Sequence, residues 1–490
     1  MIVFILFVAA FFRLIFLNQS FWLDEAAQAV LSNKNLFDVN WGADFQPPFF
    51  YVLTHFWQSF GIKEEWFLRL PSVFFGVSTV CLTYFFFKKL FNEKFGLVVA
   101  LFLATSPYHI YYSQEYRMYS FFLFLTVLSW LFLWERRWRL YGIIILAAVF
   151  THYFAFLLIF SQFIFVFISQ RGERNRYLKT TVISLFPFLL WLPTFINQMQ
   201  TASNLISVWP DWTKVSGVPF LKFPFLLLAK FTVGVTSPMR VMYGLTVGIV
   251  GMIFLLITAA ILNEIRSGKL EAGKKKDQYY LLLCYFSIPV IIAWISGLWI
   301  SINGPWRLLF VLPAFYAIIA VGTEVILAKA GYSPVFGRGI YLNRFRVKPG
   351  MTIATVLLAS NIVFYSYYLF FPKNHRENWK DAVAYTDSRV GDNGLVLTEY
   401  IGPWAPMEWY SKYPNQYTGA SLSLPITEKS IDRRFNNVTM KQSENIILYT
   451  YLFQLSDPSR FVEQYLGSKG YKLTEEKDFR GVGILKIYSR

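Results

Sequence analysis

Long apolar stretches separated by short connections constrain the fold of this 490-residue chain more than any other feature. Hydrophobic residues make up 55% of it and charged residues only 15%, whereas about a quarter of a soluble domain is charged. Inside lipid only helices and closed barrels satisfy their own backbone, and stretches of this length are typical of helices. We expect an α-helical polytopic membrane protein. Its roughly eleven candidate spans lie near residues 2–17, 70–87, 95–106, 118–134, 140–150, 153–169, 178–197, 239–262, 279–299, 307–328 and 352–371.

Lysine and arginine residues occupy alternate connections between these stretches. Their clusters lie at residues 88–94, 136–139, 171–179, 266–276 and 338–348. Because cytoplasmic loops carry the excess of basic residues, we predict that these clusters face the cytoplasm of a plasma-membrane protein. The segments predicted to lie outside are the loop 18–69, the turn 107–117, residues 199–238 and the C-terminal tail. The net charge of +17 comes mainly from the basic connections, since the tail is nearly balanced, and it does not indicate a nucleic-acid partner.

The chain divides into a membrane domain, residues 1–372, and a small extracytoplasmic domain, residues 373–490. In the first outer loop we expect a helix over 24–33 and, after Pro47-Pro48, an aromatic interfacial or re-entrant helix that ends near Phe60. A similar stretch recurs at 219–236, and residues 329–350 are predicted to be an irregular cytoplasmic connection. The tail is predicted to be α/β, with helices at 376–389 and 458–466, strands at 394–400 and 446–452, and a hairpin of 471–475 with 482–488.

Three acidic residues stand close to predicted spans on the outer face. Asp24 and Glu25 follow the first apolar segment, and Glu115 precedes the span at 118–134. Ionisable groups beside lipid are costly and usually line a cavity, form a pair or do chemistry. The pair at 24–25 fits an N-cap with a first-turn acid, and Glu115 fits a salt bridge with Arg117 or Arg69. The same groups fit a reaction centre, because carboxylates act as general bases and arginines bind phosphate.

Several motifs carry a resemblance to a known family. They are Phe21–Ala26, Gln46–Tyr51, Arg69–Ser72 with Gly76, Ala104–Tyr119, Thr151–Phe154 and Pro305–Pro313. In this order they resemble the membrane glycosyltransferases of family 39, which have a GT-C-like fold and include protein O-mannosyltransferases and lipid A aminoarabinose transferases. The resemblance covers roughly residues 20–320 and says nothing about the tail.

The resemblance implies a glycosyltransferase that moves a monosaccharide from a polyprenyl-phosphate donor to an acceptor hydroxyl outside the cytoplasm, with inversion. An acid in the first outer loop of the family serves as the base, and Asp24 matches it. The catalytic candidates are Asp24, Glu25 and Glu115, and the donor-phosphate candidates are Arg69, Arg117, Arg307 and His109. The aminoarabinose transferases carry a lysine just before the Pro-Pro pair; Gln46 stands there in this chain, which argues against an aminoarabinose substrate.

Each of the remaining candidates fits either a structural role or a role in substrate binding. His55, Tyr112 and His152 are predicted to bind substrate, although a satisfied interior histidine is the more common case for His152. With four histidines and no close acidic cluster, neither a metal site nor a cofactor is indicated. The expected partners are the lipid-linked donor, the bilayer and an acceptor glycan, lipid or protein. A transporter or flippase of lipid-linked saccharides is the alternative function, and a membrane-anchored receptor is a third.

Overall fold

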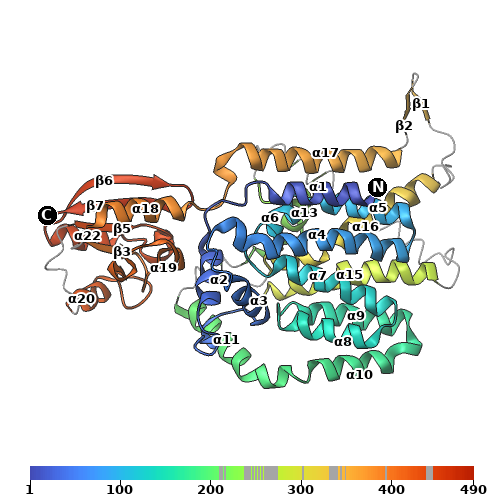
Figure 1. Cartoon of the computed structure of the whole chain (residues 1–490), viewed down its shortest axis with the longest axis horizontal. Coiled ribbons are helices and arrows are strands. Elements are labelled where there is room, and N and C mark those ends of the chain that lie inside the picture. Colours follow the sequence, from blue (N-terminus) through green and yellow to red (C-terminus); the bar gives the residue numbers. More distant parts are fainter. Residues whose placement is uncertain are drawn as a thin grey trace.

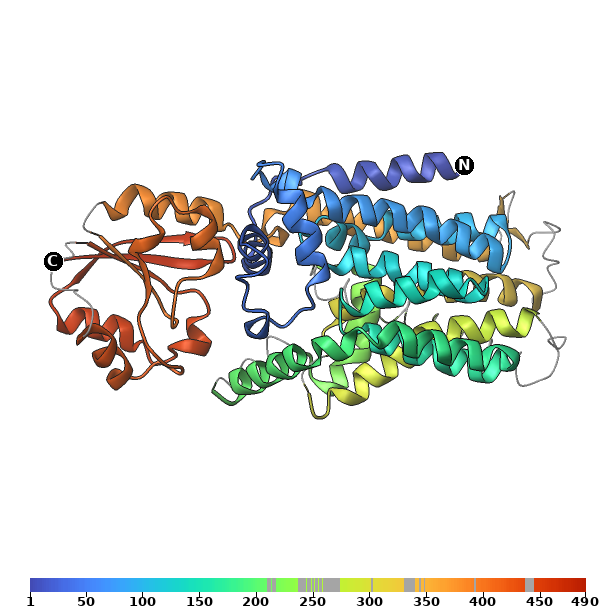
Figure 2. The same ribbon diagram turned by 60° about the horizontal axis from the view of Figure 1, so that its bottom comes forward.

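A computed structural model describes the chain as a helical bundle with an α/β domain beyond one end (Figure 1). The described residues are all of 1–490 except 209–212, 214–216, 237–243, 245–247, 249–250, 252–253, 255–257, 259–273, 301–302, 330–339, 343–344, 348, 392–393 and 437–444. Figure 2 places the first outer loop between the bundle and the α/β domain. The N-terminus lies at the opposite end of the bundle.

Helices occupy every predicted span that falls within the described residues. The bundle contains α1 (Ile2–Leu14), α4 (Glu65–Leu90), α5 (Glu93–Thr105), α6 (Pro107–Ser113), α7 (Tyr119–Trp134), α8 (Trp138–Val149), α9 (Ala155–Ser169), α10 (Arg174–Leu185), α11 (Phe188–Val208), α13 (Phe223–Val233), α15 (Lys274–Ser296), the 3₁₀ helix η5 (Pro305–Val311), α16 (Leu312–Lys329) and α17 (Pro349–Phe370). The predicted span at 239–262 lies largely outside the described residues.

Judged by helix length and composition, fewer helices could span a membrane than the sequence predicts. Among the described residues, α4 and Lys276–Ser296 of α15 are long and apolar enough to cross a membrane. The count rises to four if each of two pairs bent by 64° forms one span. One bend separates α5 from α6 just before Pro107, and the other separates α10 from α11 near Pro187. Proline interrupts the hydrogen-bond ladder, so apolar runs that look continuous in sequence become two shorter helices.

Close backbone packing holds the first helices of the bundle together. Gly96 of α5 lies against α4, where a Cβ atom at this position would come within 2.6 Å of the Tyr84 carbonyl oxygen. Small residues permit such approaches between membrane helices. Elsewhere the core is aromatic, as where Trp130 of α7 stacks on Tyr285 of α15 at a ring-centre distance of 5.1 Å. Large apolar side chains such as Phe7 on α1 remain exposed on the outer surface, as expected of a surface that faces lipid.

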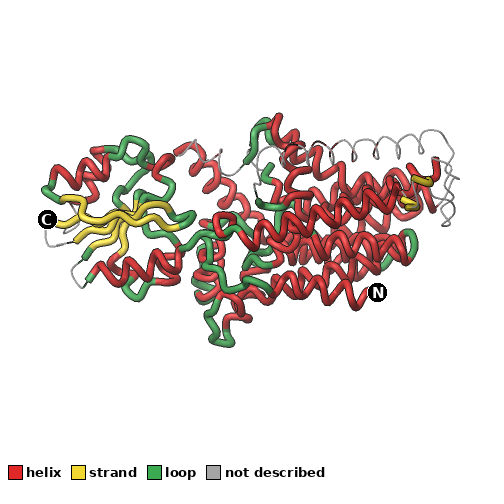
Figure 3. The backbone as a smooth tube through the Cα atoms, turned by 90° about the horizontal axis from the view of Figure 1, so that it is seen from above, coloured by secondary structure: helices red, strands yellow, loops and turns green. Residues whose placement is uncertain are grey.

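The first outer loop forms the two predicted helices. These are α2 (Leu23–Asn33) and α3 (Phe49–Gln58), joined by a loop with the 3₁₀ turn η1 (Trp41–Ala43). The second aromatic stretch forms η4 (Phe220–Lys222) and α13. In the connection predicted to be irregular, β1 (Ile340–Leu342) and β2 (Phe345–Val347) form an antiparallel hairpin. This hairpin lies at the end of the bundle opposite the α/β domain (Figures 1 and 3).

The C-terminal domain is a five-stranded sheet with helices on both faces (Figure 3). Its elements are η6 (Pro372–Asn374), α18 (Trp379–Val390), β3 (Leu395–Thr398), α19 (Ala405–Tyr410), η7 (Pro414–Gln416), β4 (Tyr417–Gly419), α20 (Glu428–Asn436), β5 (Asn445–Tyr449), α21 (Phe453–Ser456), α22 (Phe461–Ser468), β6 (Lys472–Phe479) and β7 (Gly483–Ser489). The strand order is β4-β3-β5-β7-β6, with β3 parallel to β4 and β5. The predicted strands and hairpin are present, whereas α19, β4 and α20 have too weak a pattern to be seen in the sequence.

Candidate functional site

A buried ionic cluster joins the start of α2 to the N-terminal end of α4. Arg69 donates two charge-assisted hydrogen bonds to Glu25, from Nε to Oε1 at 2.8 Å and from Nη2 to Oε2 at 2.6 Å. Glu25 Oε1 also accepts the backbone N–H of Tyr116 at 2.7 Å. Both charged side chains are almost completely buried. Such bidentate pairs fix geometry as well as charge, so Arg69 and Glu25 hold the outer loop against the bundle.

The cluster contains a residue that the sequence does not point to, Arg376 from the start of the C-terminal domain. Its Nη1 lies 3.1 Å from Glu115 Oε2 and 3.8 Å from Glu25 Oε2. Burial raises the pKa of Glu115 to about 7 against the attraction of Arg376. Burial also acts to raise the pKa of Glu25, but Arg376 and Arg69 outweigh it and hold that pKa below its ordinary value. Glu115 Oε1 has no hydrogen-bond partner among the described residues, but all four side chains are buried and pair with one another. The geometry therefore favours a structural role for Glu25, Glu115 and Arg69.

Asp24 differs from the other two acids because a substrate can reach it. Its side chain is 42% exposed, whereas Glu25 and Glu115 are 0% and 1% exposed. Neighbouring residues on a helix point about 100° apart, which separates Asp24 from the buried cluster. The guanidinium of Arg117 lies beside it, with Nη2 at 3.8 Å from Asp24 Oδ2 and Nη1 donating to the Asp24 carbonyl at 3.4 Å.

A further carboxylate, Asp44, joins Asp24 and Arg117. The Tyr51 hydroxyl bonds to both Asp44 and Arg117. Burial raises the pKa of Asp44 against the attraction of Arg117. In the described part of the chain, Asp44 Oδ2 and Arg117 Nε have no hydrogen-bond partner. Sequence reasoning missed Asp44 because it stands in a polar loop without a motif of its own; its place two residues before Gln46 in the family motif was the available signal.

The loop that carries Asp44 is held from the bundle side. Gln198 of α11 donates from Nε2 to the carbonyl oxygens of Trp41 at 2.7 Å and of Gln46 at 3.1 Å. The Trp41 ring packs on Tyr51 at a ring-centre distance of 5.7 Å. Asp44 therefore has a defined position near Asp24 and Arg117, although it lies in an irregular segment.

Other predicted residues gather around Tyr119 at the start of α7. The ring of Tyr112 lies 5.2 Å from it and that of His152 lies 6.1 Å from it, centre to centre. Arg307 acts electrostatically on Tyr119 and Asp24, and its guanidinium lies 5.2 Å from the Trp306 ring centre. The structure thus brings Tyr112, His152 and Arg307 to the side of the bundle that carries Asp24 and Arg117.

Two predicted histidines lie apart from this group. His109 is fully buried, with Nδ1 at 2.7 Å from Nη2 of Arg13. Arg13 is itself fully buried and faces the protein interior. His55 bonds through Nδ1 to the Ser32 carbonyl oxygen at 2.9 Å and joins α3 to α2. Among the described residues neither histidine forms a hydrogen bond with Asp24 or Arg117, so the geometry does not favour substrate contacts for them.

The described segments contain no cluster of side chains that could hold a metal ion. No three or more His, Cys, Asp or Glu side chains there lie close enough together to hold a metal ion. The charge-stabilising groups near Asp24 are instead the guanidiniums of Arg117 and Arg307. These can bind an anionic oxygen through planar, charge-assisted hydrogen bonds.

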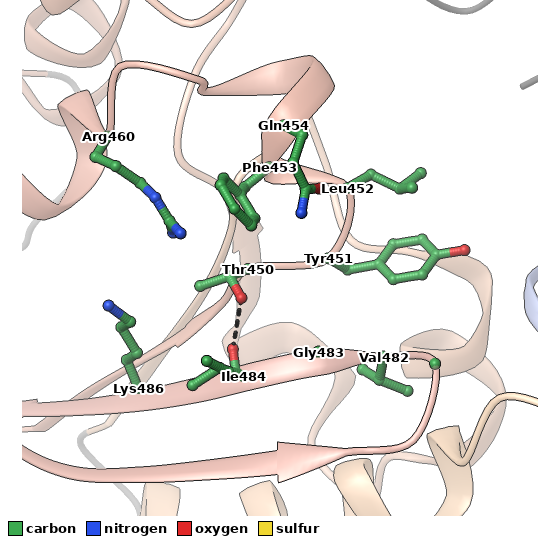
Figure 4. Close-up of a pocket in the computed structure, with 11 residues that line it drawn as sticks. Thr450, Tyr451, Leu452, Phe453, Gln454, Arg460, Val482, Gly483, Ile484 and Lys486 are labelled. Atoms are coloured by element: carbon green, nitrogen blue, oxygen red, sulfur yellow. Dashed lines mark hydrogen bonds between the residues drawn. The ribbon is translucent and has the colours of Figure 1, made fainter. Parts of the chain in front are cut away.

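The C-terminal domain contains a separate cavity of about 370 Å³ at the carboxyl end of β5 (Figure 4). Its lining residues are Thr450, Tyr451, Leu452, Phe453, Gln454, Arg460, Gly481, Val482, Gly483, Ile484 and Lys486. None of the predicted site residues belongs to it. Glu399, at the end of the neighbouring strand β3, is fully buried, and its Oε1 lies 3.8 Å from Nη1 of Arg460.

Glu399 predicts a pH dependence of stability. Burial and then the charge of Asp457 raise its pKa from 4.5 to about 8, against the attraction of Arg460. The folded form therefore holds this proton more tightly than the unfolded form. Its contribution to stability is complete below the unfolded pKa and is lost as the pH rises to the folded pKa. We expect Glu399→Gln to gain thermal stability relative to the parent protein between pH ~5 and ~9. A difference in melting temperature that stays constant over this range would contradict the expectation.

Comparisons with known proteins agree with this architecture. Residues 45–197 match the sequence family described as dolichyl-phosphate-mannose-protein mannosyltransferase, which confirms the family resemblance predicted from the motifs. No curated protein sequence matches the chain.

Solved structures share the fold at low identity. ArnT from Cupriavidus metallidurans bound to undecaprenyl phosphate is similar with a TM-score of 0.57 and 12% identity, covering 100% of this chain and 97% of that one. The archaeal oligosaccharyltransferase AglB from Archaeoglobus fulgidus, in complex with an inhibitory peptide and a dolichol-phosphate, has a TM-score of 0.55 and 13% identity, covering 91% of this chain and 69% of that one. At these identities the comparison establishes a common fold. The likeness to ArnT includes the C-terminal domain, which the motifs did not reach.

Proposed function

We propose that the chain is a glycosyltransferase that moves a monosaccharide from a polyprenyl-phosphate donor to an acceptor hydroxyl on the extracytoplasmic face of the membrane. One observation carries the proposal: an exposed carboxylate, Asp24, stands beside the guanidinium of Arg117 on the side of the bundle predicted to lie outside. The family match and the solved structures with bound polyprenyl phosphates support a lipid-phosphate donor.

In the proposed reaction Asp24 takes the proton of the acceptor hydroxyl. The acceptor oxygen then forms a bond to the anomeric carbon of the donor from the face opposite the phosphate. The bond between that carbon and the phosphate oxygen breaks, and polyprenyl phosphate leaves with the electron pair. Arg117 and Arg307 bind the departing phosphate. Asp44 Oδ2, which lacks a partner among the described residues, accepts a hydrogen bond from a sugar hydroxyl.

The direct test uses the full chain in lipid nanodiscs with a panel of polyprenyl-phosphate sugars. The expected result is release of polyprenyl phosphate together with a glycosylated acceptor of inverted anomeric configuration. The same donors in proteoliposomes test the transporter alternative. Movement of intact donor across the bilayer without release of polyprenyl phosphate would show that the protein is a flippase and not a glycosyltransferase.

Arg117→Lys separates charge from geometry in the donor site. Lysine keeps the charge but loses the planar fork that binds two oxygens. Loss of one charge-assisted bond costs about 1.5–3 kcal/mol, so we expect kcat/KM for the donor to fall roughly tenfold or more. Arg389→Lys, on the exposed surface of the C-terminal domain, is the control. Unchanged kcat/KM in Arg117→Lys would remove this residue from the phosphate site.

Cysteine labelling tests the proposed orientation. Ser388 on α18 and Asn175 on α10 are both exposed, and they lie on opposite sides of the predicted membrane. In intact cells we expect Ser388→Cys to react with an impermeant maleimide and Asn175→Cys to react only after lysis. The parent protein, whose cysteines are Cys81 and Cys284, measures the background. Labelling of Asn175→Cys in intact cells would reverse the orientation.

A further inference from the structure

The C-terminal domain is packed directly on the helix that carries Asp24. The short helix α19 lies against α2, and the backbone N–H of Phe21 donates to the Tyr410 hydroxyl at 2.8 Å. The Phe21 ring also packs on Trp409 at a ring-centre distance of 6.1 Å. A domain that was joined to the bundle only by a flexible linker would make none of these contacts. The C-terminal domain is therefore docked on the first outer loop.

The N-terminus of α2 takes its hydrogen-bond acceptor from this domain. Trp22 occupies the N-cap position and makes no side-chain capping bond. The backbone N–H of Leu23 donates instead to Glu377 Oε2 at 3.2 Å. A carboxylate at this end of a helix satisfies an otherwise unpaired N–H and interacts favourably with the helix dipole.

The C-terminal domain holds Glu377 in one orientation. The indole N–H of Trp379 donates to Oε2 at 2.7 Å, and the Tyr451 hydroxyl donates to Oε1 at 3.0 Å. Tyr451 also lines the cavity of Figure 4. Both carboxylate oxygens are therefore fixed from the domain side, and the cap cannot rotate without breaking one of these bonds.

Arg376 and Glu377 contact the residues on either side of Asp24. Glu377 binds the N–H of Leu23, and Arg376 lies 3.8 Å from the carboxylate of Glu25. Asp24 itself is 42% exposed and lies beside Arg117 and within the electrostatic reach of Arg307, and its direction is set by this first turn of α2.

We propose that Glu377 is a positioning residue for Asp24, and that docking of the C-terminal domain through Arg376-Glu377 sets the geometry of the candidate base. The inference rests on the proposed function for its kinetic consequence. Its structural consequence, order in the first turn of α2, stands independently of any activity.

The test compares Glu377→Leu with Glu377→Gln in the full chain in nanodiscs. Glutamine is isosteric and preserves all three bonds, because its oxygen accepts from Leu23 and Trp379 while its amide donates to the Tyr451 hydroxyl. Leucine removes all three. We expect Glu377→Leu to lower kcat about tenfold to a hundredfold, with donor KM within about twofold, and Glu377→Gln to keep most of the activity.

Glu463→Leu is the matched control for general damage to the domain. Glu463 also binds three partners, Arg460, Lys486 and the Tyr488 hydroxyl, but it lies away from α2. It is expected to lower the melting temperature of the domain and leave kcat unchanged. Equal losses of kcat in Glu463→Leu and Glu377→Leu would overturn the proposal.

Hydrogen exchange separates failure of this inference from failure of the proposed function. In Glu377→Leu the amides of the peptide 20–33 should exchange faster than in the parent, and in Glu377→Gln they should not. Unchanged exchange in Glu377→Leu would overturn the positioning role whatever the kinetics. Faster exchange in a chain whose parent transfers no sugar would support the positioning role and reject the proposed function alone.

Discussion

Replacing Asp24 by asparagine should lower the rate of sugar transfer by about 10²–10⁴ while the protein stays folded and binds its donor. General-base catalysis is worth about that factor, and the amide keeps the size of the carboxylate without its basicity. The structural cost is small because Asp24 is 42% exposed and its ion pair with Arg117 is 3.8 Å long. A long pair with one partly exposed partner contributes about 0–1 kcal/mol, and the buried guanidinium of Arg117 keeps Tyr51 and Asp44 as neighbours.

The measurement combines single-turnover transfer, donor binding and melting temperature for Asp24→Asn and Asp44→Asn. Asp44 is the matched comparison, since both carboxylates lie beside Arg117. We expect Asp44→Asn to raise the donor KM and to keep most of kcat. If Asp24→Asn keeps most of its kcat while Asp44→Asn loses it, the base is Asp44. The acceptor hydroxyl must then approach the anomeric carbon from the side of Asp44.

The sequence predicts those parts of the fold that depend on local patterns. The helix after Asp24, the aromatic helix after Pro47-Pro48 and the α/β character of the tail all follow from apolar periodicity and breakers within a few residues. The different environments of Asp24 and Glu25 also follow from the sequence, because a helix turns about 100° per residue. In these cases the nearest neighbours along the chain decide the structure.

The partners of the acids could not be predicted. Arg376 is 261 residues from Glu115 along the chain and stands in a segment that resembles no family motif. Without it, Glu25, Glu115 and Arg69 look like a reaction centre, because the sequence displays charges without showing which of them neutralise one another. Asp44 lies near Arg117 in a loop that contacts far away in the sequence hold in place, among them the bond from Gln198 to the Gln46 carbonyl oxygen.

Replacing Arg69 by methionine should be the most destabilising single change among the site residues. Its guanidinium binds both oxygens of Glu25 and also donates to the carbonyl oxygens of residues 17, 19 and 20, at 2.5, 2.6 and 3.2 Å. The variant leaves the buried carboxylate of Glu25 with the backbone N–H of Tyr116 and, as its only remaining nearby cation among the described residues, the more distant Arg376. Removing one partner of a buried pair costs about 3–5 kcal/mol, so the melting temperature in detergent should fall by many degrees.

The double variant Arg69→Met with Glu25→Leu identifies the source of that loss. It removes the uncompensated carboxylate, and apolar replacements of buried pairs are often neutral, so the double variant should melt above Arg69→Met. Lys34→Met is the control, because Lys34 and Glu408 are 3.9 Å apart and about half exposed, and it should melt with the parent. A double variant no more stable than Arg69→Met would assign the loss to the carbonyl bonds that hold the linker into α2. An Arg69→Met protein as stable as the parent would show that the buried cluster does not hold the outer loop to the bundle.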